Sequence, residues 1–179
     1  WAAINPLSRF DWFLENILVF VSAPFIIFSY FKFRLSNLSY FLIFIFLVLH
    51  VASAHYTYAE TPWGDWLTNA FGFARNHFDR IVHFLWGLLM TSVVAEVLSD
   101  HLPRRGLVKG FLIFAVVVCF GALYEVAEMV FANLVAPEKG LAWVGAQGDI
   151  WDAEKDMFLQ ALGAVINLLI LKRVIHSKN

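Results

Sequence analysis

The apolar stretch LVKGFLIFAVVVCFGALYEVAEMVFANL, from Leu107 to Leu134, is the strongest structural signal in the sequence. A helix rises 1.5 Å per residue, so about 20 apolar residues cross the hydrocarbon core of a bilayer, which is about 30 Å thick. Polar groups are costly at that depth, yet Tyr124, Glu125 and Glu128 lie toward the end of the stretch. The stretch therefore predicts a membrane helix that carries functional acids near one end.

The composition of the whole 179-residue chain indicates the same class of protein. Hydrophobic residues make up 60%, aromatic residues 17% and charged residues 15%, whereas soluble domains carry about 25% charged residues. The mean hydropathy is +0.69. These values exclude a nucleic-acid binder, a disulfide scaffold and a disordered tail. The single cysteine, Cys119, excludes an intramolecular disulfide and a cysteine-rich metal site.

Four further apolar runs give five candidate spans in all, and no repeat or linker divides them. The five predicted spans cover Asn16 to Phe31, Leu38 to Ala54, Ile81 to Leu98, Leu107 to Leu134 and Met157 to Ile175. We expect polar shoulders, residues 11–15 and 149–156, to continue the first and last helices into the interface. The predicted fold is all-α: a polytopic membrane bundle of about five transmembrane helices, forming a single domain over residues 1–179.

Basic residues are distributed unequally between the two sides of this bundle. With five spans, one side holds eight of the 13: Lys32, Arg34, Arg104, Arg105, Lys109, Lys172, Arg173 and Lys178. The opposite side holds the other five and 12 of the 14 acids. Because short loops rich in Lys and Arg stay in the cytoplasm, we expect the C-terminus in the cytoplasm and the N-terminus outside.

Ionisable residues gather at the predicted outer ends of the spans, at one common depth. Asp79 and His83 are four residues apart and share a helix face. Three further acids would form a single stripe on one face if residues 149–156 are helical: Asp149, Asp152 and Asp156. The candidate metal ligands are His55, Asp79, His83, Glu125, Glu128, Asp149, Asp152 and Asp156. We expect these side chains to meet in one pocket.

Carboxylates on one stripe repel each other unless protons, arginines or a cation neutralise them. A divalent cation neutralises two charges at once, and imidazole ligands favour Zn, Mn or Fe, with Mg and Ca as alternatives. The candidate catalytic residues are Glu125, Asp79 and His83. The candidate substrate-binding residues are Arg75, Arg80 and Tyr124, with the arginines steering an anionic headgroup.

Each cluster also has a structural explanation. Acids favour a helix N-terminus, which would account for residues 149–156. Tyrosines and tryptophans form an interfacial belt in membrane proteins, which would account for residues 55–66. Arg75 and Arg80 would pair with local carboxylates. Glu125 and Glu128 are harder to explain in this way, because acids within a membrane are costly and by default functional.

Four ordered motifs carry a resemblance to a known family. They are HYTYAE (His55 to Glu60), RNHFDRIVHF (Arg75 to Phe84), YEVAE (Tyr124 to Glu128) and GDIWDAEKDM (Gly148 to Met157). Together with DWFLEN, residues 11–16, they resemble the YjdF-like bacterial inner-membrane proteins over nearly the whole chain. The resemblance implies a multi-span protein of the bacterial inner membrane in a domain-of-unknown-function family. It supplies no reaction, substrate or ligand set.

Three functions fit these features. The first is a membrane-embedded, divalent-metal-dependent enzyme whose outer-face site acts on a lipid-linked or headgroup substrate. The second is a cation- or proton-coupled transporter, and the third is an assembly partner in a membrane complex. A polar cluster on one side and an apolar inner half favour the enzyme over a conduit. The expected partners are the lipid bilayer and a lipid-linked substrate, with a homodimer left open and no nucleic acid.

Overall fold

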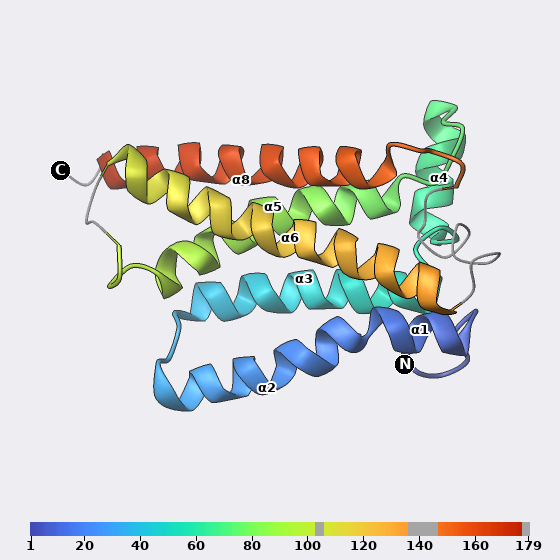
Figure 1. Cartoon of the computed structure of the whole chain (residues 1–179), viewed down its shortest axis with the longest axis horizontal. Coiled ribbons are helices and arrows are strands. Elements are labelled where there is room, and N and C mark those ends of the chain that lie inside the picture. Colours follow the sequence, from blue (N-terminus) through green and yellow to red (C-terminus); the bar gives the residue numbers. More distant parts are fainter. Residues whose placement is uncertain (103–105, 136–146, 177–179) are drawn as a thin grey trace.

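The computed structural model describes residues 1–102, 106–135 and 147–176, and the regular structure in these ranges is entirely helical. The helices are α1 (Arg9–Glu15), α2 (Ile17–Lys32), α3 (Asn37–His55), α4 (Pro62–Phe71), α5 (Phe78–Val97), α6 (Leu107–Val135) and α8 (Asp152–His176). Figure 1 shows the long helices lying side by side, with α4 at one end of the bundle. The predicted all-α bundle is therefore confirmed.

Four stretches in the described part of the chain are long and apolar enough to cross a membrane, judged by length and composition. They are Arg9–Lys32, Asn37–His55, Phe78–Val97 and Leu107–Leu134. The fifth predicted span lies within α8, a helix of 25 residues that runs beside α5 and α6. Its crossing of the membrane stays a prediction.

The polar shoulder of the first span is helical, as the sequence predicts. Asn16 joins α1 to α2 because its backbone is itself helical (φ −75°, ψ 0°) and its side-chain Nδ2 donates to the carbonyl of Trp12 at 2.7 Å. Pro24 lies inside α2, where a membrane helix tolerates it. Glu15 is thereby carried on the same continuous helical stretch as the apolar residues that follow.

The shoulder of the last span differs from the prediction. Helix α8 begins at Asp152, so Asp149 lies in the turn before it rather than on a helical stripe with Asp152 and Asp156. The backbone N–H of Trp151 donates to Asp149 Oδ1 at 3.1 Å, which holds this turn. A carboxylate that bonds a nearby backbone N–H competes with helix formation. Only Asp152 and Asp156 share the helix.

The closest helix pair is α5 with α8, and two glycines allow it. A Cβ atom on Gly87 would lie 1.9 Å from the carbonyl oxygen of Gln160, and one on Gly163 would lie 2.2 Å from that of Phe84. Farther along, Asn167 Nδ2 donates to the carbonyl of Leu88 at 2.6 Å. Small residues let membrane helices approach and polar side chains hold them together. These contacts fix how far α8 is shifted along α5.

Helix α6 is fixed to this pair by hydrogen bonds in the middle of the bundle. Trp86 Nε1 donates to the carbonyl of Val117 at 3.1 Å, and Gln160 Nε2 donates to that of Val118 at 2.9 Å. On the other side of α5, α3 packs through an apolar cluster that includes Phe46, Val82 and Met90. The opposite surfaces of α2, α3 and α6 expose large apolar side chains, as expected of a protein that faces lipid.

The two ends of the bundle differ in charge. At one end lie the starts of α5 and α8, the ends of α3 and α6, and α1 and α4 (Figure 1). We call this the polar end, because the predicted site residues lie there. The other end carries Lys32, Arg34, Lys109 and Lys172, and we call it the basic end. Of the other residues predicted for that side, Arg104, Arg105 and Lys178 lie outside the described residues, as does the side chain of Arg173.

Substituting either interface glycine should separate α5 from α8. Gly87→Ala and Gly163→Ala each place a methyl group against backbone atoms, which cannot move as a side-chain tip can. Overpacking of this kind costs about 1–3 kcal/mol, so both variants should melt at lower temperature in detergent. The matched control is Gly110→Ala on α6, where an added Cβ meets nothing within 4 Å. Equal melting temperatures for all three variants would contradict the close-packed interface.

Candidate metal site

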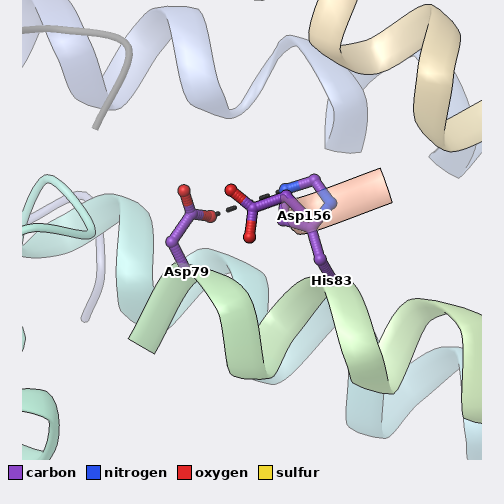
Figure 2. Close-up of side chains that lie close together, drawn as sticks. All are labelled: Asp79, His83 and Asp156. Carbon is purple, nitrogen blue, oxygen red and sulfur yellow. Dashed lines mark ion pairs between the residues drawn. The ribbon is translucent and has the colours of Figure 1, made fainter. Parts of the chain in front are cut away.

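Three of the predicted ligands meet at the polar end of the bundle. Asp79 and His83 lie one turn apart on α5, and Asp156 approaches them from α8 (Figure 2). One ligand atom from each lies within 4.8 Å of the other two. His83 Nε2 lies 3.6 Å from Asp79 Oδ1. Because Asp156 is only 2% exposed and His83 7%, this group lies inside the protein.

Glu125 joins the group from α6. Its Oε1 lies 3.2 Å from His83 Nε2, yet the two are not aligned for a hydrogen bond, and this oxygen is buried without a donor. Asp156 Oδ1 is also buried without a donor within the described structure. Buried carboxylate oxygens are costly unless a donor, a proton or a cation meets them. Two such oxygens around one histidine are therefore suited to bind a cation or to share protons.

Two arginines lie beside this group and bind other acids. Arg75 Nη1 lies 2.5 Å from Asp152 Oδ1, and Arg80 Nη2 lies 2.5 Å from Asp149 Oδ2 and 3.1 Å from Asp152 Oδ1. Lys155 Nζ adds a contact of 2.6 Å to Asp149. We call these five residues the arginine layer. The predicted acids therefore fall into two sets. Asp149 and Asp152 pair with arginine and lysine side chains, whereas within the described structure Asp79, Asp156 and Glu125 do not contact the arginine layer in this way.

The arginine layer agrees with the salt-bridge explanation of Arg75 and Arg80, which both hold the start of α8. Arg80 Nη1 also donates to His77 Nδ1 at 3.1 Å. Partial burial, together with the positive charges of Arg80 and Arg75, lowers the pKa of His77 below its ordinary value of 6.5. His77 is therefore neutral at pH 7, as its role as an acceptor requires.

The loop before α5 holds Arg75 in place through its neighbour Asn76. The side chain of Asn76 donates to the carbonyl of Thr61 at 3.1 Å and to Asp65 Oδ1 at 3.0 Å, and it accepts from the N–H of Phe78 at 3.0 Å. Its backbone exchanges hydrogen bonds with the side chain of Gln147. Gly64 is needed beside it, because a Cβ there would lie within 1.9 Å of Asn76 Oδ1.

A second buried polar network lies deeper and was not predicted as part of the site. Tyr58 Oη donates to His50 Nδ1 at 2.5 Å, and His50 Nε2 donates to the carbonyl of Glu15 at 3.0 Å. A carbonyl only accepts, so the imidazole carries its hydrogen on Nε2. The Glu15 carboxylate accepts from Tyr124 Oη at 2.8 Å. Burial raises the pKa of Tyr58 well above 10, which keeps this hydroxyl protonated.

This network changes the interpretation of several residues. Glu15 is buried, at 7% exposed, although the sequence suggested an interfacial shoulder. The available signal was an acid placed directly before the first apolar run. Tyr58 belongs to the core rather than to an interfacial belt. The hydroxyl of Tyr124, a predicted substrate-binding residue, donates to Glu15 and is therefore occupied within the protein.

The remaining predicted ligands lie around or away from this centre. His55 lies apart: its ring stacks on Trp1 at 4.7 Å between centroids, and its Nδ1 bonds the carbonyl of Ala2 at 3.0 Å. Glu128 is half-buried one turn beyond Tyr124 on α6. The structure thus brings Asp79, His83, Glu125 and Asp156 together, and not the full predicted set.

Comparison with known proteins places the chain among membrane proteins. Residues 1–177 match the family described as "Predicted membrane protein (DUF2238)". The chain belongs to this family. It is also 30% identical over 174 residues to the inner membrane protein YjdF of Escherichia coli (strain K12), covering 97% of this chain and 83% of that protein. The predicted resemblance to YjdF-like proteins is confirmed, and no solved structure matches the chain.

Because Asp149 is ion-paired in the arginine layer, we expect the protein to lose stability when acid protonates this carboxylate. Hydrogen bonds from Lys155, from the N–H of Trp151 and from Arg80 hold the pKa of Asp149 far below its ordinary value of 3.8. The stabilisation is therefore present above about pH 4 and is lost as the pH falls toward the lowered value. At pH 7 the wild type should have a higher melting temperature than Asp149→Asn. This difference in melting temperature should shrink below about pH 4.

Melting curves of both proteins in detergent between about pH 3 and pH 7 measure this difference. The control is Glu154→Gln, because Glu154 is exposed on α8 and belongs to neither set of contacts. A difference between wild type and Asp149→Asn that stays constant down to about pH 3 would contradict the ion pairing of Asp149.

Proposed function

We propose that this family member is a membrane-embedded enzyme that binds a divalent cation through Asp79, His83 and Asp156. The observation that carries the proposal is Asp156 Oδ1, a buried oxygen without a donor in a group whose ligand atoms lie within 4.8 Å of one another. Two carboxylates and one imidazole suit Zn, Mn or Fe, with Mg and Ca as alternatives. Glu125 is near enough to add a fourth ligand or to act as a base.

The balance of charge supports a cation over arginine pairing. Asp149 and Asp152 take the contacts of Arg75, Arg80 and Lys155. Asp79, Asp156 and Glu125 then face one another with His83 between them. A buried charge without a partner is strongly unfavourable. A bound cation would remove this cost and would use the orientation of all three side chains.

The chemistry that such a site supports is hydrolysis or transfer at a polar headgroup. A bound divalent cation lowers the pKa of water and polarises phosphoryl or carbonyl oxygens. Glu125 would accept a proton from the attacking group, and Asp79, one turn from His83 on α5, would hold the cation together with it. Arg75 and Arg80 would act mainly by holding α8, and with it Asp156, against α5. The substrate class that suits a site at the end of a membrane bundle is a lipid-linked molecule.

A cation- or proton-coupled transporter would use the same acids, but it needs a polar path to the other side. Toward the basic end, the wall next to this group holds three aromatic side chains, Phe46, Trp86 and Phe120, and one amide, Gln160. A wall that is mainly aromatic supports a site open to one side. We therefore favour the enzyme over the transporter.

The expected location is a bacterial inner membrane, as for the Escherichia coli relative that its name places there. Lys32, Arg34, Lys109 and Lys172 at the basic end support a cytoplasmic position for that end. The N-terminus and the metal site would then lie outside, and the C-terminus in the cytoplasm.

Metal binding should stabilise the wild-type fold. Binding to the folded state alone contributes about 2.7 kcal/mol at a hundredfold excess over the dissociation constant. Chelation should therefore lower the melting temperature of purified wild type, and add-back of Zn or Mn should restore it. Asp156→Asn and Asp79→Asn should lose this response and should lose stoichiometric metal in elemental analysis. Glu154→Gln, which changes an exposed acid on the same helix as Asp156, should behave as wild type.

A protein without bound metal would contradict this proposal. If wild type contains no stoichiometric metal and neither chelation nor add-back changes its melting, the metal proposal fails. Protons shared among Asp79, Asp156 and Glu125 would then account for the cluster, and the transporter would become the preferred function.

The proposed orientation is tested by fusions after Asn179. A fluorescent protein placed there should fluoresce, and an alkaline phosphatase placed there should be inactive, because the C-terminus is expected in the cytoplasm. Matched fusions after Glu60, at the polar end, should give the reverse pattern. An active phosphatase at Asn179 would invert the orientation and move the site to the cytoplasmic face.

A further inference from the structure

A cavity of about 80 Å³ adjoins the candidate metal site and extends into the bundle. Asp79 and His83 form part of its wall at the polar end. Phe46, Trp86 and Phe120 form the wall farther from that end. From Asp79 to Trp86 the cavity follows α5 for seven residues, about 10 Å.

The surface of this cavity is almost entirely carbon. Polar side chains do border it, and most of their polar atoms bond other groups: Gln160 Nε2 donates to the carbonyl of Val118, whereas Gln160 Oε1 is buried without a donor among the described residues. His50 and Tyr58 bond each other, and the Tyr124 hydroxyl donates to Glu15. Cavities lined by apolar atoms stay dry and take up apolar molecules. The cavity is therefore suited to hydrocarbon rather than to water or an ion.

The cavity also reaches the lipid-facing surface. Phe120 is part of its wall and is 59% exposed. Leu18 of α2 also lines the cavity. A hydrocarbon chain could therefore enter between α2 and α6 without leaving the membrane.

We propose that this cavity holds the first carbons of one hydrocarbon chain of an anionic amphiphile, whose polar end lies at Asp79 and His83. The proposal rests on the metal site proposed above, because a bound cation is what would attract the anionic end. It names the substrate class: a lipid-linked anion such as a long-chain phosphate monoester, bound head toward the polar end and chain toward the bundle centre.

The size of the cavity limits how much of the chain it holds. An engineered cavity of about 150 Å³ binds benzene, and this one is about half as large. Only a short segment therefore fits inside, and the rest of the chain must pass Phe120 into the bilayer. A chain bound in this way would position the headgroup beside His83 while most of the lipid stays in its ordinary surroundings.

The test uses dodecyl phosphate as the probe and inorganic phosphate as the comparison, with metal-loaded protein in amphipol and calorimetry as the readout. Dodecyl phosphate should bind wild type at least tenfold more tightly than inorganic phosphate does. Leu18→Trp and the milder Leu18→Phe fill the cavity. Both should weaken the binding of dodecyl phosphate at least tenfold and leave the metal content unchanged. The matched control is Val21→Trp on the same helix, where the side chain is 56% exposed, and it should bind as wild type does.

The outcomes separate this proposal from the metal proposal. If both Leu18 variants keep their metal and bind dodecyl phosphate as wild type does, the cavity proposal is overturned while the metal site stands. If dodecyl phosphate binding depends on Leu18 but the protein holds no metal, the chain-binding cavity is supported and the metal proposal fails. If dodecyl phosphate binds no more tightly than inorganic phosphate, the chain makes no contribution and the cavity proposal is overturned.

Discussion

Backbone contact between α5 and α8 is the constraint on which the candidate site depends. Gly87 and Gly163 let the two helices approach until carbonyl oxygens meet the glycine positions, and Asn167 fixes their relative shift through the Leu88 carbonyl. Asp156 of α8 lies beside Asp79 and His83 at that separation. Contacts near the middle of the membrane bundle therefore set the geometry of polar groups at its end.

The arrangement of charge at the polar end follows from this approach. Two positions on α8, one turn apart, have opposite surroundings. Asp152 meets Arg75 and Arg80, whereas Asp156 meets another carboxylate and a histidine. A carboxylate within reach of guanidinium groups is stabilised as an anion, whereas clustered carboxylates need a proton or a cation. The polar end thus combines a layer of ion pairs with a buried cluster of carboxylates around one histidine.

The sequence was sufficient to predict the elements and the end at which they carry their acids. Apolar runs, together with the i, i+4 spacing of Asp79 and His83, depend only on local geometry. It could not predict which acid would meet which cation, because that depends on helix rotation and crossing. For this reason local spacing places Asp149 with Asp156, includes His55 in the site and leaves out Glu15, which is buried through contacts with residues far away in sequence.

The arginine layer has a consequence for how the chain is made. Arg75 and Arg80 enter the membrane with α5, but their partners Asp149 and Asp152 are synthesised some 70 residues later, with the last helix. Until α8 is made, Arg75 and Arg80 lack the two carboxylates that contact them in the folded protein. Assembly of the last helix would therefore act as a checkpoint. A chain without α8 would keep both arginines at the polar end and lack Asp149 and Asp152, so the charge of that end is balanced only when the last helix packs.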